Sequence, residues 1–387
     1  MVSVDIRPPD LALVPHWDAL VARAGGNVFM HPAALCAAAA AGFAKIHVLR
    51  AWEGDKLVGL WGLGERRAAP FLPKFLASPP YEYAFVANPV IDPEYDVMPA
   101  FFDAIAREPT LPKVIQLKLL DGEAATYRAA VTALGAREGQ MLKTSERVRP
   151  FLGAESERKR SGSTAKKLRQ DWNRLSALGA VEIANGRAAD GVRASLEVFL
   201  TMEAQSWKGA NGTALLCQED DAAFARRLIG DLADRGGASV ALLRVDGKPI
   251  AAQVLLYSGP MAYTWKTAFD AEFAKFSPGA LLIDKVTDAL FAAGIAQFES
   301  CSPEGSFMEQ LWTGRRSTVD MLVDVGARKS AAFMLAAASE HAYAWARAKR
   351  NQLRALSWPL PRRKISLSRG LEPARRGSAW RAAVLPY

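Results

Sequence analysis

The chain has 387 residues, of which 50% are hydrophobic and 23% charged, and its mean hydropathy is zero. This composition is typical of a soluble globular protein with room for two or three domains, and it excludes collagen-like, disordered and disulfide-scaffold classes. The uncharged stretches 27–44 and 249–265 contain Pro and Gly, and neither has the roughly 20 continuous apolar residues of a membrane span. The first residues lack the pattern of a signal peptide.

Several common site types have no signature in this sequence. The three cysteines are odd in number and far apart, so we expect reduced thiols in a cytoplasmic protein. The four histidines are scattered, so we expect no metal site. Motifs of α/β serine hydrolases, P-loop NTPases and simple Rossmann dehydrogenases are missing.

The formal net charge of +9 is concentrated at the end of the chain. Residues 328–387 contain 13 Lys and Arg but only two acids, and the remainder is close to neutral. Aromatic and aliphatic residues are interleaved with these cations, which favours peripheral contact with an anionic membrane. A solvated tail is the plainer alternative, and nucleic acid is not expected because no recognised binding motif is present.

The first half of the chain alternates strand and helix patterns. Residues 45–52 and 56–64 flank Glu53-Gly54-Asp55 and predict a β-hairpin. A helix over 99–107, a strand over 113–120 and a helix over 121–134 follow.

The second half gives a clearer order. Residues 164–178 predict a basic amphipathic helix with Gly179 at its C-terminal end. Helices are predicted over 189–206 and 220–234. Three strands follow over 239–245, 249–257 and 261–269, then a loop over 270–276, a helix over 278–293 and a strand over 295–300.

The two hairpin regions resemble each other, which suggests two copies of one mixed α/β unit, although any two hairpins share such features. We therefore predict tandem mixed sheets flanked by helices, with a basic helical appendage at the C-terminus. The expected domains are residues 1–150, 151–327 and 328–387.

The segment before the last predicted helix carries a signal for anion binding. Ser277 suits an N-cap, Pro278 suits the first helical position, and Gly279 and Ala280 allow close approach to the helix start. Unpaired N–H groups and the helix dipole favour a pyrophosphate there, and Lys275 adds positive charge. The alternative is that these residues only begin a helix.

Several further blocks stand out: Lys266-Thr-Ala-Phe-Asp270 with Ser277-Pro-Gly279, the basic helix from Lys159 to Gly179, Gln205-Ser-Trp207-Lys208, Lys248 to Ala252, and Leu311-Trp312 with Arg315. Together these blocks resemble the CelD-like acetyltransferases of the GCN5-related N-acetyltransferase (GNAT) superfamily. The resemblance covers residues 155–320 well and residues 1–150 faintly. It implies tandem GNAT units related to FemAB-like aminoacyltransferases.

The resemblance implies acyl-CoA or acetyl-CoA as co-substrate. The expected donor-binding residues are Lys275, Phe276, Ser277, Gly279 and Ala280. The expected acceptor-binding residues are Lys166, Arg169, Trp207, Lys208, Gln253, Lys266, Trp312 and Arg315.

Glu299, at the end of the last predicted strand, is the candidate general base, and Asp270 is the second catalytic candidate. The family often has Asp-Phe-x-x-Gly followed by Tyr-Lys after the last strand. This chain has Phe298-Glu299-Ser300 and no Tyr-Lys, which leaves the acceptor open.

The sequence therefore predicts a cytoplasmic acyltransferase, with peripheral contact with the inner membrane, that acylates an amine on a cell-envelope precursor. The amine belongs to an amino sugar of an exopolysaccharide or to a sphingoid or other lipid. The alternatives are a non-catalytic membrane-peripheral subunit of polysaccharide synthesis and a tRNA-dependent aminoacyltransferase.

Overall fold

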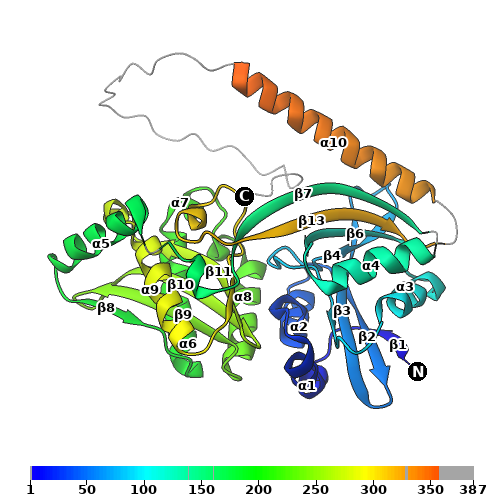
Figure 1. The fold of residues 1–387 in the computed structure, drawn as a ribbon, viewed down its shortest axis with the longest axis horizontal. Helices are drawn as coiled ribbons and strands as arrows, with labels where there is room; N and C mark the ends of the chain where they lie inside the picture. Colours follow the sequence, from blue (N-terminus) through cyan, green and yellow to red (C-terminus); the bar gives the residue numbers. More distant parts are fainter. Residues whose placement is uncertain (1, 138, 160, 327–329, 357–387) are drawn as a thin grey trace. The chain divides into compact units, whose positions relative to one another are not determined.

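The computed structural model describes all residues except 1, 138, 160, 327–329 and 357–387, and the chain forms two compact units, residues 1–336 and 337–387 (Figure 1). Its strands are β1 (Ser3–Arg7), β2 (Lys45–Glu53), β3 (Lys56–Arg67), β4 (Lys74–Ser78), β5 (Val90–Ile91), β6 (Val114–Asp121), β7 (Gln140–Leu152), β8 (Val181–Ala184), β9 (Ala238–Val245), β10 (Lys248–Ser258), β11 (Met261–Phe269), β12 (Gln297–Glu299) and β13 (Arg315–Asp324).

The α-helices are α1 (Val14–Ala24), α2 (Pro32–Ala40), α3 (Met98–Arg107), α4 (Ala125–Ala136), α5 (Gly162–Ser176), α6 (Ala189–Ala204), α7 (Trp207–Ala210), α8 (Glu219–Ala233), α9 (Pro278–Ala292) and α10 (Ala331–Leu356). A 3-10 helix, Ala271–Phe276, occupies the segment that the sequence predicted as a loop. Among the described helices, none combines the length and the apolar composition needed to cross a membrane.

The repeated unit predicted from the sequence is confirmed in the topology. In the first half, β2, β3 and β4 pair antiparallel, and β6 returns parallel to β4 after α3. In the second half, β9, β10 and β11 pair antiparallel, and β12 returns parallel to β11 after α9. The fold is therefore the predicted mixed α/β architecture with helices flanking the sheet.

Two long strands that the sequence analysis missed join the halves. β13 pairs with both β6 and β7, and β7 also pairs with β12, so that the strand order is β1-β2-β3-β4-β6-β13-β7-β12-β11-β10-β9-β8. Figure 1 shows β7 and β13 side by side in a long arch that starts in the middle of the fold and extends over the N-terminal half. The sheet consequently continues past the expected boundary near residue 150.

Gly247 allows a tight turn, as the sequence predicted, whereas Gly179 is explained by a different contact from the one predicted. Asp246 and Gly247 have φ of 47° and 79°, as the tight β9–β10 turn requires. Gly179 does not end α5 in a left-handed conformation. A Cβ at Gly179 would clash with the Asp246 carboxylate, which accepts a hydrogen bond from the N–H of Ala180, so glycine is required by close approach.

The two halves share apolar packing. Phe224 of α8 stacks on Tyr83 and lies 5.0 Å from Phe43, both from the N-terminal half. A second core packs α9 against the opposite face of β10 and β12 and includes Leu255, Leu282 and Phe298. The sheet of the second half is therefore held from both faces.

Candidate active site

The parallel strands β11 and β12 separate within the sheet. Their register pairs end at Tyr263 opposite Glu299, and the hydroxyl of Thr264 donates a hydrogen bond to the carbonyl of Ser300 at 2.9 Å. Among the described residues, no strand pairs with residues 265–269 on that side, here called the free half of β11. An open strand edge offers N–H and C=O groups to an extended ligand.

Helix α9 begins directly over the free half of β11. Its N-cap is Ser277, as predicted, but the Ser277 backbone is left-handed with φ of 51° and its side chain does not cap the helix. Within the described part of the chain, the N–H groups of Gly279 and Ala280 have no hydrogen-bond acceptor. A Cβ at Gly279 would lie 3.4 Å from Cγ2 of Thr267, so the helix start faces this strand closely.

Cations gather around the start of α9. Lys167 Nζ donates to Ser277 Oγ at 2.7 Å, while Arg174 and Lys275 lie 5.3 Å and 5.1 Å from the ring centre of Phe276. Phe276 itself is a buried core side chain, so only its backbone can take the donor-binding role predicted for it. Helix dipole, free N–H groups and these cations together suit an anionic phosphate group.

The basic helix α5 contributes a different residue from those expected. Lys167, which the sequence analysis did not select, reaches the start of α9, and its i+4 partner Asp171 is buried. Lys166 is exposed, and Arg169 instead lines a separate cavity of about 250 Å³ beside Trp172. A one-position error in helical phase rotates the chosen side chain by about 100°, which explains the miss.

A polar cluster lies beside the free half of β11. Glu203 is completely buried, and its carboxylate accepts hydrogen bonds from Lys208 Nζ at 2.8 Å and from the N–H of Leu215 at 3.0 Å. Lys208 Nζ also lies 3.4 Å from the carbonyl oxygen of Thr267. Lys208 therefore ties α6 to the strand edge where we place the ligand.

Lys266 carries the other positive charge of this strand. Its Nζ lies 4.7 Å from the ring centre of Tyr83 and 5.6 Å from that of Trp265. Burial lowers the pKa of Lys266 to about 8, although the negative charge of Glu203 opposes the shift. Within the described residues, this ammonium group has no hydrogen bond or ion pair of its own.

Gln253 is also buried on the neighbouring strand, opposite Thr267 in register. Its side-chain oxygen accepts a hydrogen bond from the Thr267 hydroxyl, and its amide donates to the carbonyl of Val254 at 2.8 Å. These bonds occupy the Gln253 side chain, so its predicted contact with the acceptor requires a rearrangement.

The geometry of Glu299 does not suit a general base. Its side chain is completely buried, one oxygen accepts from the N–H of Cys301 at 3.1 Å, and the other lies 3.0 Å from Arg149 and 3.3 Å from Arg316. Both oxygens are therefore already committed to protein groups, and the buried carboxylate does not face an open surface.

Asp270 stabilises the turn that leads from β11 into the 3-10 helix Ala271–Phe276. It caps the 3-10 helix by accepting from the N–H of Glu272 at 3.0 Å, and it lies 2.9 Å from Lys248 Nζ. Burial would raise the pKa of Asp270, but the hydrogen bonds from Lys248 and Glu272 outweigh it and lower the pKa. Asp270 also lines a surface cavity of about 680 Å³ against α6.

The three remaining predicted acceptor residues lie in different environments. Trp207 is 62% exposed and remains free to contact a ligand. Trp312 is only 1% exposed and packs against Phe298, so its predicted contact with the acceptor would require a rearrangement and stays a prediction. Arg315 donates to the carbonyls of Trp312 and Gly314, both at 2.9 Å, and fixes the chain between them.

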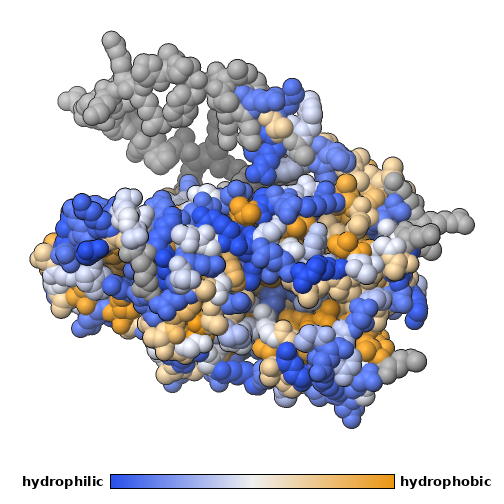
Figure 2. Space-filling view, viewed as in Figure 1, coloured by the Kyte–Doolittle hydropathy of each residue, from blue (hydrophilic) through white to orange (hydrophobic). Residues whose placement is uncertain are grey.

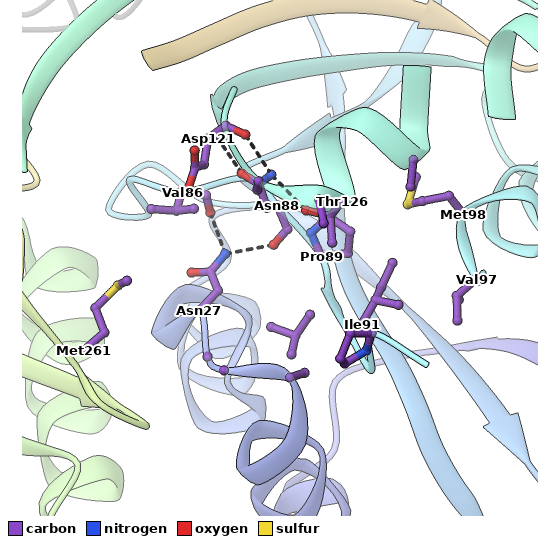
Figure 3. Close-up of a pocket in the computed structure, with 18 of the residues that line it drawn as sticks. Asn27, Val86, Asn88, Pro89, Ile91, Val97, Met98, Asp121, Thr126 and Met261 are labelled. Atoms are coloured by element: carbon purple, nitrogen blue, oxygen red, sulfur yellow. Dashed lines mark hydrogen bonds between the residues drawn. The ribbon is translucent and has the colours of Figure 1, made fainter. Parts of the chain in front are cut away.

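A cavity of about 700 Å³ lies between the two halves, on the side of Tyr263 (Figure 3). One wall comes from the second half, including Met261, Tyr263 and Arg316, and the other from the N-terminal half. The space-filling view shows apolar surface in a hollow on this side of the molecule (Figure 2). The sequence analysis missed this cavity because its lining residues are spread over six segments of the chain.

Comparison with known proteins agrees with this geometry. Residues 162–304 match the acetyltransferase (GNAT) domain family. Among curated proteins, no sequence matches the chain.

Three solved structures share the fold at low sequence identity. FemX has a TM-score of 0.54 at 11% identity, over 82% of this chain and 96% of that one. The C-terminal domain of a putative lysylphosphatidylglycerol synthetase from Agrobacterium fabrum has 0.52 at 13%, over 82% and 93%. L-PGS from Bacillus licheniformis has 0.50 at 12%, over 84% and 94%.

Residues 162–304 therefore match the GNAT domain family, and the chain shares its fold with FemX over 82% of its length. The narrower resemblance to the CelD-like family stays a prediction.

Proposed function

We propose that this protein is a GNAT-superfamily N-acyltransferase that moves an acyl group from acyl-CoA to an amine of a cell-envelope precursor. One observation carries the proposal: α9 begins with unpaired N–H groups at Gly279 and Ala280, directly over the free half of β11. A pyrophosphate at the helix start leaves an extended arm to follow the open strand edge. The thioester would then lie where β11 and β12 separate.

The chain's own residues supply binding and orientation. Lys167 and Lys275 neutralise phosphate charge, and the edge of β11 hydrogen-bonds the amide groups of the arm. The neutral amine attacks the thioester carbon, and a carbon–nitrogen bond forms as the carbon–sulfur bond breaks. The proton that the amine loses passes to the departing thiolate of CoA, which leaves as the thiol. Orientation provides much of the rate because a thioester is already activated.

Lys266 has the position of an oxyanion stabiliser in this scheme. Its ammonium group lies on the free half of β11 and has no committed partner among the described residues. A fixed positive charge beside the reacting carbonyl stabilises the negative charge that develops on its oxygen.

The proposal is tested by calorimetric titration of acetyl-CoA into the full chain and into Gly279→Glu. The new carboxylate lies over β11 and repels phosphate, so we expect binding to be lost. Gly191→Glu, an exposed position in the first turn of α6 with no neighbour near its Cβ, is the matched control and keeps wild-type affinity. Normal affinity in a folded Gly279→Glu protein rejects the donor site.

A second donor class, aminoacyl-tRNA, is favoured by the cations of α5 near the same helix start. Acetyl-CoA and a charged tRNA compete for one site in that case, and the donor that supports transfer to an amine identifies the class. A non-catalytic subunit of polysaccharide synthesis, the remaining alternative, binds neither donor productively.

A further inference from the structure

The cavity between the halves approaches the point where β11 and β12 separate. Tyr263 forms the last register pair before the separation, opposite Glu299, and it also lines the cavity. Its hydroxyl donates to the carbonyl of Gly26 at 3.0 Å, which leaves the oxygen lone pairs to accept a hydrogen bond. Burial raises the pKa of Tyr263 above its ordinary value, so the group stays a neutral phenol.

The side chains that line the middle of the cavity are polar and are held by hydrogen bonds within the wall. Asn27 donates to the carbonyls of Val86 and Asn88, at 3.1 Å and 2.9 Å. Asn88 in turn donates to the Thr126 hydroxyl and accepts from the N–H of Asp121 at 2.6 Å (Figure 3). These side chains are occupied with one another, so they hold the wall in place.

The far end of the cavity is apolar. Figure 3 shows Met261 on one side of the cavity and Ile91, Val97 and Met98 on the other, with the asparagines between them. Val97 and Met98 are each 1% exposed. A ligand that reaches from Tyr263 to this end meets hydrogen-bonding groups first and aliphatic side chains last.

The charges of the lining disfavour a phosphorylated ligand. Arg316 is the cation among the described lining residues, and it is already held by Asp121 at 3.2 Å and by Glu299. Two exposed acids, Glu94 and Asp96, also line the cavity. A nucleotide diphosphate needs uncommitted cations, and Asp96, directly before Val97 in the chain, adds a negative charge that repels it.

We propose that this cavity binds the acyl acceptor, and that the acceptor is an amphiphilic primary amine with its nitrogen toward Tyr263 and its aliphatic part toward Met98. The inference rests on the proposed function and narrows it, because it selects a lipid-like amine over a nucleotide-linked amino sugar. Gln297, half-buried in the same wall, supplies a second polar group near Tyr263.

The first test is calorimetric titration of the full chain with hexylamine, octylamine and decylamine, with decanol and UDP-glucosamine as comparison ligands. Each added methylene that becomes buried tightens binding about fourfold. We expect this dependence on chain length, with decylamine binding more tightly than both comparison ligands. Affinity that does not change with chain length, or tighter binding of UDP-glucosamine, overturns the proposal.

The second test locates the binding site. Ala129→Phe on α4 fills the cavity from a half-buried position, and we expect decylamine affinity to fall more than tenfold. Thr132→Phe, exposed on the same helix and outside the lining, is the matched control and retains affinity. Equal affinity in Ala129→Phe and Thr132→Phe means that the amine binds elsewhere and rejects the assignment.

Measuring both ligands on each variant distinguishes the two proposals. Ala129→Phe keeps acetyl-CoA affinity and Gly279→Glu keeps decylamine affinity if both are right. If acetyl-CoA binds as proposed but decylamine ignores Ala129→Phe, only the acceptor inference fails. If Gly279→Glu still binds acetyl-CoA normally, the donor site fails whatever decylamine does.

Discussion

Glu299 and Arg149 form an ion pair inside the protein, with 3.0 Å between Oε2 and the guanidinium Nη2 and a carboxylate that is completely buried. Arg316 adds a second contact to the same oxygen at 3.3 Å. The three residues lie on β12, β7 and β13, so the pair fastens the sheet where its two halves meet. Removing Glu299 leaves the buried Arg149 guanidinium without its carboxylate, whereas Arg316 keeps Asp121 at 3.2 Å.

We therefore expect Glu299→Gln to lower the free energy of unfolding by about 3–5 kcal/mol, measured by urea denaturation. Replacing Arg149 by Met in the same background should recover part of this loss, because one uncompensated cation is removed. The general-base hypothesis predicts a different result: nearly unchanged stability with turnover reduced about 10²–10⁴-fold. Measuring stability and turnover on one preparation decides between the two roles.

Trp207 and Lys208 are neighbours in α7, but we expect their substitution to change the stability of the protein by very different amounts. Lys208→Met leaves the buried Glu203 carboxylate without its cation, and we expect a loss of about 2 kcal/mol or more in unfolding free energy. Trp207→Ala removes a side chain that is 62% exposed, so stability should stay within about 0.5 kcal/mol. Thermal unfolding of both variants is the measurement, and a larger loss for Trp207→Ala contradicts the structural assignment.

Lys266 should make stability depend on pH in the alkaline range. Its folded pKa of about 8 lies below the ordinary value of 10.5. Below pH 8 both folded and unfolded states carry the proton, and the cost of burying the charge is fully present. As pH rises from 8 toward 10.5, the folded state loses the proton first, so Lys266 destabilises the protein progressively less.

The comparison is with Lys266→Met, which lacks this titration. Between pH 8 and 9.5, the unfolding free energy of the wild type should rise relative to that of the variant, by at most about 1.4 kcal/mol per pH unit. Glu203, Lys208, Asp221 and Tyr83 face the same ammonium group and are present in both proteins. A difference that stays flat over this range contradicts the lowered pKa.

The second half of the fold was predictable because its signals are local. Asp246-Gly247 marks a tight turn, and Ser277-Pro278-Gly279 marks the start of α9, and both are where the sequence indicated. The sequence analysis did not predict the strands β7 and β13, because they pair with segments that are far away in the chain. In particular, β7 alternates exposed and half-buried residues over most of its length, which weakens its apolar pattern.

The candidate site was only partly predictable for the same reason. The start of α9 is a property of one segment, so the residues from Lys275 to Ala280 were found together. Glu299 was expected to be accessible because it ends a strand, but Arg149 and Arg316 come from the two missed strands and enclose it. Trp312 was selected because it belongs to a sequence block that resembles the family. Its burial depends on tertiary packing, which a local motif does not show.

The last prediction concerns the basic end of the chain, which the sequence links to membranes. Residues 357–387 lie outside the described part of the structure, but α10 is described and carries exposed Tyr343 and Trp345. Residues 328–387 hold 13 Lys and Arg against two acids. Polybasic segments gain about 1 kcal/mol per cation near an anionic bilayer, so five cations give a dissociation constant on the order of 0.1 mM before any aromatic contact.

We expect the full chain to sediment with vesicles containing anionic lipid at 0.1 M salt and to be released at 1 M, as the Debye length falls from about 10 Å to about 3 Å. Neutral vesicles should not bind it. A chain ended after Ala336 is the control, because it keeps buried Phe333 and the hydrogen bond from Ser330 to Asp324 while removing most of the charge. This shorter chain should stay in the supernatant and still bind acetyl-CoA. If the full chain ignores anionic vesicles at low salt, an amphiphilic acceptor has to reach the cavity from solution or on a carrier, and the basic segment serves another partner.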